Sequence, residues 1–351
     1  MMRRAGSIVV ALLATLMTGC SASATPPGAS STASVVGVLL DSGSENDRSF
    51  NQYTLEGARK AAEANGLGFA YREPQSADEY QAALESLIAD LQPALAITVG
   101  FRMGSATAQS AGRHPAPQFA IVDNSYAPGA GCADTVKDCY TVEGGLSNVT
   151  SLMSAEDEAA YPAGVLAGCM TQTGVVATVA GENIPPVVRL VTGFEAGARS
   201  VRSGITTLHQ YIPDFNDPPT GQVVGQGFIR QGADIIFGAG GNTGNGGLLA
   251  AKEAGVMAIG VDVDQYFTYP AVASALLTSA MKFVDVNANG AVTDFATGKL
   301  RPGIRLGTLA NGGVGLAPYH DWDGQIPQRC KDLVDQATAA VKADPTITGA
   351  K

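Results

Sequence analysis

The chain has little of the charge and histidine that nucleic-acid and catalytic sites use. Charged residues make up 15% of 351 residues, and 22 Lys and Arg stand against 32 Asp and Glu, a formal net charge of -10. A nucleic-acid-binding protein needs a basic face against the phosphates, so we expect no nucleic-acid partner. The three histidines are scattered away from the expected strand ends. This argues against a zinc site or a Ser/His/Asp triad, and we expect no bound metal.

Long apolar runs are also missing. The run Ile8–Met17 is too short to span a bilayer, and nothing later in the chain reaches membrane length. Preceded by Arg3 and Arg4, this run is typical of an export signal. Leu16-Met17-Thr18-Gly19-Cys20 resembles a bacterial lipobox, so we expect residues 1–20 to be a lipoprotein signal peptide with Cys20 lipidated. Residues 21–34, rich in Ser, Ala, Thr and Pro, predict a flexible tether.

Known nucleotide-binding signatures are absent from the one glycine-rich segment, residues 232–265. Its apolar runs Ala233–Phe237 and Val256–Val261 predict two buried parallel strands. Between them we expect a turn at Gly238–Gly247 and a helix at Leu248–Glu253. The turn matches neither GxGxxG nor GK[ST], so it predicts neither a dinucleotide site nor a P-loop. Its glycines serve either a ligand or a tight crossover where backbones approach closely.

Polar residues follow this pair of strands at the point where each strand ends. Gly240 and Gly241 end the first strand, and Asp262 ends the second. Ligands of open α/β sheets bind outside the carboxyl ends of the strands. A carboxylate beside bare backbone suits a polyhydroxyl ligand such as ribose. The segment therefore predicts a small-molecule cleft.

Strands and helices alternate along the whole chain at the spacing of parallel β-α-β units, which predicts the α/β class. Two such series predict two similar lobes that bury a ligand by hinge closure. We expect a first lobe of residues 35–145 plus about 266–297, and a second of 146–265 plus about 298–345. A helix at 279–287 would carry Lys282, and Leu300–Leu309 and Val314–Ala317 would form a hairpin.

Four cysteines follow Cys20, an even number in an oxidising location. Cys132 and Cys139 flank a short polar loop and are expected to pair, which leaves Cys169 and Cys330 as the second pair. Four cysteines allow three connectivities, and the sequence does not choose among them; four reduced thiols are the alternative.

Other candidate residues cluster near expected strand ends. Asp41 and Asp123 follow the first and fourth strands, and Asp47 lies in the loop before the first helix. A single strand-end Asp more often caps a helix or turn, so the set carries more weight than any member. Lys282 would neutralise Asp262, because an unpaired buried charge is costly. Phe50 and Phe215 serve either as core residues or as stacking platforms for a base.

Taken together, these segments resemble the basic membrane protein family of lipoproteins, which includes a purine nucleoside receptor. The matching segments follow the family's order over nearly the whole mature chain. They are Asp47-Arg48-Ser49-Phe50-Asn51-Gln52, Glu158-Ala159-Ala160-Tyr161-Pro162-Ala163-Gly164, Pro185-Pro186-Val187-Val188-Arg189, Gly193-Phe194-Glu195-Ala196-Gly197, Phe215-Asn216-Asp217-Pro218, the block from Gly232-Ala233-Asp234 through Gly260-Val261-Asp262-Val263-Asp264-Gln265, and Thr278-Ser279-Ala280-Met281-Lys282.

The resemblance implies two Rossmann-like lobes with parallel sheets joined by a hinge, the type I periplasmic-binding-protein fold. It also implies a nucleoside clamped between the lobes. Phe50 would stack on the base and Asn51 would supply an amide, while Asp123 would read the base edge. Asp262 and Lys282 would hold the ribose, and Asp41 and Asp47 would line the same mouth.

The resemblance further implies a binding protein that is not an enzyme and needs no cofactor. It would capture purine nucleosides such as guanosine, inosine and adenosine for an ATP-driven (ABC-type) importer permease. We expect a monomer held by its lipid on the extracytoplasmic face of the cell membrane. The alternatives are a receptor or sensor of the same fold for a sugar or other small molecule, and a secreted nucleoside hydrolase.

Overall fold

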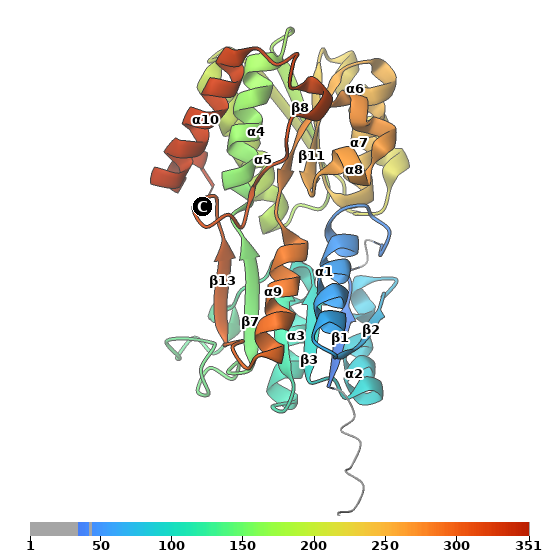
Figure 1. Ribbon diagram of the computed structural model, residues 1–351, viewed down its shortest axis with the longest axis vertical. Coiled ribbons are helices and arrows are strands. Elements are labelled where there is room, and N and C mark those ends of the chain that lie inside the picture. The colour runs from blue at the N-terminus through green and yellow to red at the C-terminus, as the bar shows by residue number, and fades with distance from the viewer. Residues whose placement is uncertain (1–33, 42–43, 351) are drawn as a thin grey trace, which may run out of the picture. The chain divides into compact units, whose positions relative to one another are not determined.

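The computed structural model describes residues 34–41 and 44–350 (Figure 1). The expected signal peptide, Cys20 and nearly all of the tether lie outside the described residues. Within the described part of the chain, no helix combines the length and the apolar character needed to cross a bilayer.

The first of two large sheets carries strands from three parts of the chain. All its strand pairs are parallel, and most of its strands are short apolar runs with both faces buried. In the described residues its order is β13 (Gly303–Gly307), β7 (Val149–Ser154), β4 (Gln118–Val122), β3 (Leu95–Val99), β1 (Val35–Leu39) and β2 (Gly68–Arg72).

Helices cover both faces of this sheet, and we call the sheet with its helices the first lobe. Apolar side chains of α1 (Phe50–Ala64) and α9 (Val284–Ala296) pack on one face. Those of α2 (Tyr80–Leu91) and α3 (Gly104–Arg113) pack on the other. Short elements complete the lobe: η1 (Ala77–Glu79), η2 (Phe101–Met103), β5 (Ala127–Pro128) and β6 (Gly131–Cys132).

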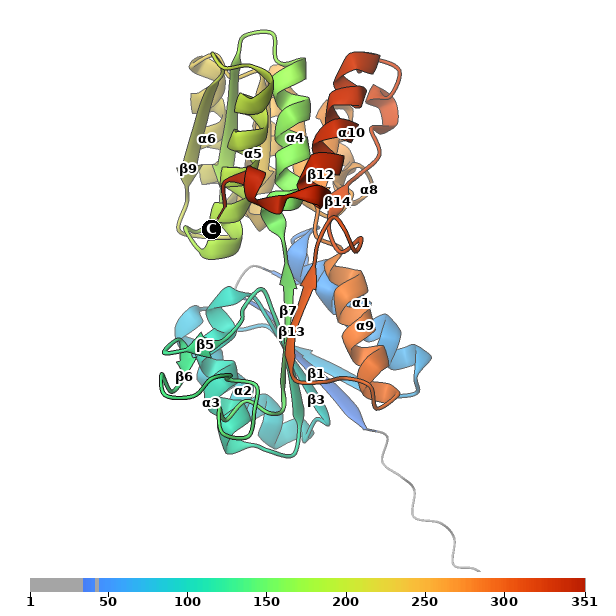
Figure 2. The same ribbon diagram turned by 90° about the vertical axis from the view of Figure 1, so that its left-hand side faces the viewer.

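The second lobe repeats this plan (Figure 2). Its sheet has the order β14 (Gly315–Leu316), β12 (Leu276–Met281), β11 (Met257–Asp262), β10 (Ile235–Ala239), β8 (Val175–Ala180) and β9 (Thr206–Tyr211), and β14 alone of these pairs antiparallel. Helices α4 (Glu156–Met170), α5 (Pro185–Val201) and α10 (Gln328–Ala343) cover one face, and α6 (Pro218–Arg230) and α7 (Gly241–Ala254) the other. Shorter helices are α8 (Gln265–Thr268), η3 (Pro270–Ala275), η4 (His320–Trp322) and η5 (Pro345–Thr348).

The chain passes between the lobes at three places in the described residues: from β7 to α4, from β12 to α9, and from β13 to β14. Strands β7 and β13, which lead into two of these passages, pair side by side along their lengths (Figure 2). The two lobes are therefore joined by these three connections, which together form a hinge.

The α/β class and the two parallel-sheet lobes are confirmed. Three strands, however, belong to the other lobe from the one expected. β7 and β13 belong to the first sheet and β12 to the second. The expected hairpin is wrong, because β13 and β14 join different sheets. Strand-like patterns do not reveal when the chain changes lobe.

Helix α6 was missed, although Asp217 caps it and prolines occupy its first turn.

Helix α7 begins at Gly241, inside the segment expected to be a turn. Glycine disfavours helix by about 1 kcal/mol relative to alanine, so packing overrides propensity here. A Cβ at Gly246 would collide with the backbone of α6, and one at Gly247 would press on Val179 of β8. The glycines therefore allow α7 to lie close against its neighbours.

The structure contains both expected disulfide bonds. Cys132–Cys139 closes a short surface loop beside α3, and Cys169–Cys330 joins α4 to α10 within the second lobe. The sequence separations are 7 and 161 residues. Constraint of the unfolded chain grows with the loop that is closed.

We expect the paired substitutions Cys169→Ala and Cys330→Ala to lower the free energy of unfolding by about 2–5 kcal/mol. The matched pair Cys132→Ala and Cys139→Ala should cost about 2–3 kcal/mol less, because its loop is much shorter. Urea denaturation of both variants checks this. Equal losses would contradict the chain-entropy explanation.

Candidate ligand-binding site

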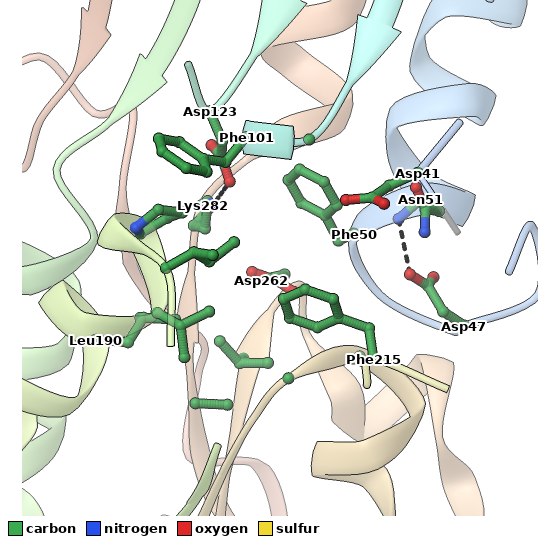
Figure 3. A pocket seen from close by; sticks show the side chains of 18 residues that line it. Asp41, Asp47, Phe50, Asn51, Phe101, Asp123, Leu190, Phe215, Asp262 and Lys282 are labelled. Atoms are coloured by element: carbon green, nitrogen blue, oxygen red, sulfur yellow. Dashed lines mark hydrogen bonds and ion pairs between the residues drawn. The ribbon is translucent and has the colours of Figure 1, made fainter. Parts of the chain in front are cut away.

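A cavity lies between the two lobes at the carboxyl ends of their strands (Figure 3). It contains about 580 Å³ of space free of protein atoms, its open mouth included. Every residue expected to contact ligand lines it: Asp41, Asp47, Phe50, Asn51, Asp123, Phe215, Gly240, Gly241, Asp262 and Lys282.

The first turn of α1 is fixed by the buried carboxylate of Asp47. Its oxygens accept backbone N–H groups of Ser49 at 2.9 Å, Asn51 at 2.8 Å and Gln52 at 3.1 Å. Burial raises the pKa of Asp47 to about 7, although these three donors oppose the shift. Asp47 therefore acts as a helix cap that sets the positions of Phe50 and Asn51 in the cavity.

Two aspartates occupy equivalent places in the two sheets. Asp123 follows β4, Asp262 ends β11, and each strand is flanked by the corresponding neighbours in its own lobe. Both have left-handed backbones, with φ of 63° and 64°. Left-handed non-glycine residues are uncommon and strained, and they concentrate at functional sites. The turn aims each carboxylate into the space between the lobes.

Asp262 is held from the opposite lobe. The Ser49 hydroxyl at the start of α1 donates to Oδ2 of Asp262 at 2.6 Å. Burial raises the pKa of Asp262, while the nearby Lys282 charge and the Ser49 hydroxyl oppose that rise. Ser49 was not among the expected site residues, although it stands in the quoted Ser-Phe-Asn segment.

Lys282 lies directly after β12, in the passage to the first lobe, and not on a helix as expected. Its ammonium pairs with Asp123 and lies 3.4 Å from Glu156 Oε1, so its direct partners differ from the expected Asp262. A backbone hydrogen bond of 2.8 Å links Lys282 to Asp262 instead. Burial alone would lower the pKa of Lys282, but the combined charges of Asp123, Glu156 and Asp262 raise it.

Glu156, like Ser49, belongs to the polar network beside the cavity and was not expected from the sequence. It is fully buried at the first residue of α4, just after the β7 passage, and Arg189 of α5 lies 3.3 Å from its Oε2. Burial raises its pKa to about 7 against the opposing charge of Lys282. Its signal was the acidic run Glu156-Asp157-Glu158, which reads equally well as an ordinary helix start.

Two buried acceptors at the cavity have no hydrogen-bond partner among the described residues: Asn51 Oδ1 and Asp123 Oδ1. Leaving a buried acceptor unsatisfied costs about 1–3 kcal/mol. A ligand that brings N–H or O–H donors would satisfy both atoms.

Aromatic and aliphatic side chains form the rest of the wall. Figure 3 shows Phe50 and Phe101 entering from the first lobe and Phe215 from the second. The Lys282 ammonium lies 4.9 Å from the centre of the Phe50 ring. The second lobe adds Leu190 and other apolar residues of α5. The cavity therefore suits a flat ligand with polar edges.

Glycine is required beside Phe215. A Cβ on Gly240 would collide with the backbone of Gly181, where the ends of β10 and β8 approach each other. Gly241 has a left-handed φ of 54° and starts α7, and a Cβ added there would lie 3.0 Å from the Phe215 carbonyl oxygen. These positions leave bare backbone at the cavity floor. In the described part of the chain, no group of three or more His, Cys, Asp or Glu is arranged to hold a metal ion.

Two parallel-sheet lobes, several hinge connections and one cavity between strand ends define a solute-binding protein of the periplasmic-binding-protein type. The chain belongs to the Bmp family, described as ABC transporter substrate-binding protein PnrA-like, whose family model matches residues 34–335.

Named relatives and solved structures agree with this assignment. The ABC transporter nucleoside-binding protein BmpA of Lactococcus lactis is 31% identical over 300 residues, 80% of each chain. The CD4+ T-cell-stimulating antigen of Listeria innocua is 30% identical over 305 residues, covering 82% of this chain and 80% of that protein. A solute-binding protein of an ABC transporter system from Aeropyrum pernix K1 has a TM-score of 0.72 at 26% identity, covering 88% and 86%.

The two acids with pKa values near 7 predict how stability depends on pH. Glu156 and Asp47 have folded-state pKa values of about 7, above their ordinary 4.5 and 3.8. The folded protein thus binds their protons more tightly than the unfolded chain, and stability falls as pH rises from about 4 to about 7. Denaturation at pH 5 and pH 8 should give a larger free energy of unfolding at pH 5.

Glu156→Gln should flatten this dependence by on the order of 1–3 kcal/mol. Glu143→Gln, at an exposed loop position, is the matched control and should leave the dependence unchanged. A wild-type protein that gains stability between pH 5 and pH 8 would show that the charges around Glu156 outweigh its burial.

Proposed function

We propose that this protein captures purine nucleosides outside the cytoplasmic membrane and delivers them to an ATP-driven importer. The observation that carries the proposal is one cavity with aromatic rings from both lobes beside a set of buried carboxylates. A flat base stacks between Phe50 and Phe215, and ribose hydroxyls donate to the carboxylates. The 31% identity to a Lactococcus lactis protein named as nucleoside-binding supports the choice of ligand.

The polar groups divide between the two ends of such a ligand. The unsatisfied oxygens of Asn51 and Asp123 accept N–H groups of the base edge. Asp262, with the backbone at Gly240 and Gly241, accepts hydroxyl donors of the ribose. Lys282 donates a hydrogen bond to a ribose oxygen while it neutralises Asp123.

The charge of the lining argues for an unphosphorylated ligand. Four aspartates (Asp41, Asp47, Asp123 and Asp262) and one lysine (Lys282) line the cavity. A phosphate would be repelled by this excess of carboxylates. Nucleosides therefore fit the cavity better than nucleotides.

The expected lipid anchor at Cys20 would hold the protein on the extracytoplasmic face, as a monomer that needs no cofactor. Several relatives from Pyrococcus are named as lipoproteins, which supports the anchor. The protein traps the ligand by hinge closure and does no chemistry on it. Incubation with inosine should therefore release no hypoxanthine.

Calorimetry with guanosine, inosine, adenosine, inosine 5′-monophosphate and D-ribose tests the proposal. We expect the nucleosides to bind more tightly than ribose and the monophosphate to bind weakly or not at all. Binding of ribose without any nucleoside would instead establish the alternative, a sugar receptor of the same fold.

The stacking role of Phe50 predicts a selective loss. Phe50→Ala should weaken each nucleoside by about 1–3 kcal/mol and leave ribose affinity nearly unchanged, because only the base has an aromatic face. Phe267→Ala, a surface phenylalanine with 67% exposure, is the control and should bind as wild type. Equal losses for nucleosides and ribose would reject the stacking role.

The hydroxyl-binding role of Asp262 predicts a loss for both classes of ligand. Asp262→Asn should cost about 1.5–3 kcal/mol, since a charged acceptor becomes a neutral one. Folding should be little affected, because asparagine still accepts the Ser49 hydroxyl. Calorimetry on this variant and on exposed Asp134→Asn checks the expectation. A variant that loses only nucleoside affinity would place Asp262 at the base.

A further inference from the structure

An arginine outside the cavity wall pairs with both lobes at once. Arg102 lies in η2, just after β3 of the first lobe. Its Nη2 is 2.9 Å from Oδ1 of Asp41, which follows β1 of the same lobe. Its Nη1 is 2.9 Å from Oε1 of Glu182, which follows β8 of the second lobe. One guanidinium thus bridges the two sets of strand ends.

The first-lobe side of this bridge is held by several contacts. Nη2 of Arg102 also donates to the Tyr80 hydroxyl at 3.0 Å, and that hydroxyl donates to Asp41. The guanidinium lies 5.7 Å from the centre of the Tyr80 ring. With two partners in its own lobe, Arg102 is held in place to meet Glu182 and loses little side-chain entropy when the lobes approach.

The same contacts fix a carboxylate that lines the cavity. Gly100, between β3 and Arg102, has a φ of 105°, and a Cβ there would collide with Oδ2 of Asp41. The backbone and the guanidinium together set the orientation of the Asp41 carboxylate. Asp41 lines the cavity, whereas neither Arg102 nor Glu182 is among its lining residues.

We propose that Arg102 is a positioning residue that couples ligand recognition at Asp41 to closure of the lobes through its ion pair with Glu182. This deepens, and rests on, the proposed capture of a nucleoside by closure. The side chains of Arg102 and Glu182 are 23% and 15% exposed, so this ion pair is partly buried. Its contribution is therefore measurable, and salt weakens it.

The experiment measures the dissociation rate of inosine from wild type, Glu182→Gln, Arg102→Met and the double variant, at about 0.02 and 0.5 M salt. Glu182→Gln should release inosine about threefold to tenfold faster at low salt, since it removes one partly shielded ion pair. The rate should also depend less on salt than in wild type. The free energy of unfolding without ligand should be nearly unchanged, which separates closure from a structural role.

Arg102→Met should release inosine faster still, because it also removes the ion pair that helps to orient the Asp41 carboxylate. Adding Glu182→Gln to it should change nothing further, since both substitutions break the same bridge. Arg113→Met is the matched control. Arg113 pairs with Glu85 at 2.7 Å within the first lobe, so its loss should leave the dissociation rate as in wild type.

Wild-type dissociation rates and salt dependence in Glu182→Gln and Arg102→Met would overturn the bridge while nucleoside capture stands. If wild type binds no nucleoside, the proposed function fails, and small-angle X-ray scattering of the ligand-free proteins decides the bridge. A Glu182→Gln protein more expanded than wild type at low salt supports it. Equal radii of gyration overturn it.

Discussion

The ammonium of Lys282 is the charge around which the two lobes are joined. It is fully buried, and its partners are Asp123 at the end of a first-lobe strand and Glu156 at the start of a second-lobe helix. Removing one partner of a buried pair typically costs about 3–5 kcal/mol, because the other charge is left unpaired. Lys282 lies in one passage between the lobes, and Glu156 begins the helix that follows another. The network therefore fixes the hinge and the cavity wall together.

Parallel sheets explain why the remaining polar groups meet at this place. The carboxyl ends of the strands in both sheets face the same cavity, so residues that follow strands, such as Asp41, Asp123 and Asp262, converge on it. The left-handed backbones of Asp123 and Asp262 cost local strain that the buried strands on either side can support. Covering each sheet on both faces with helices leaves this edge as the natural place for a ligand.

The sequence predicted the α/β class and the cavity lining well, because apolar runs ending in Asp or Gly signal both strands and strand ends. The sequence did not predict features that depend on contacts between distant parts of the chain. The glycines of α7 read as a turn, yet close packing on α6 and β8 makes them helical. Lobe membership of β7, β12 and β13 was misassigned because local patterns carry no information on which sheet a strand joins. Partners such as Glu156 with Lys282 and Ser49 with Asp262 are 126 and 213 residues apart, beyond any local pattern.

Closure of the lobes and recognition of the ligand are linked by a balance of small free-energy contributions. Besides the Arg102–Glu182 pair, Ser49 donates to Asp262, Asn245 donates to the Asp47 carbonyl, and Thr268 donates to the Arg48 carbonyl across the cleft. Each such bond contributes about 0.5–1.5 kcal/mol net. Closing without a ligand also has a cost that opposes these bonds. It leaves Asn51 Oδ1 and Asp123 Oδ1 buried without a hydrogen bond, which costs about 1–3 kcal/mol for each atom. A ligand that donates to both oxygens removes this penalty only in the closed form, and that differential contact is what allows it to shift the equilibrium toward closure.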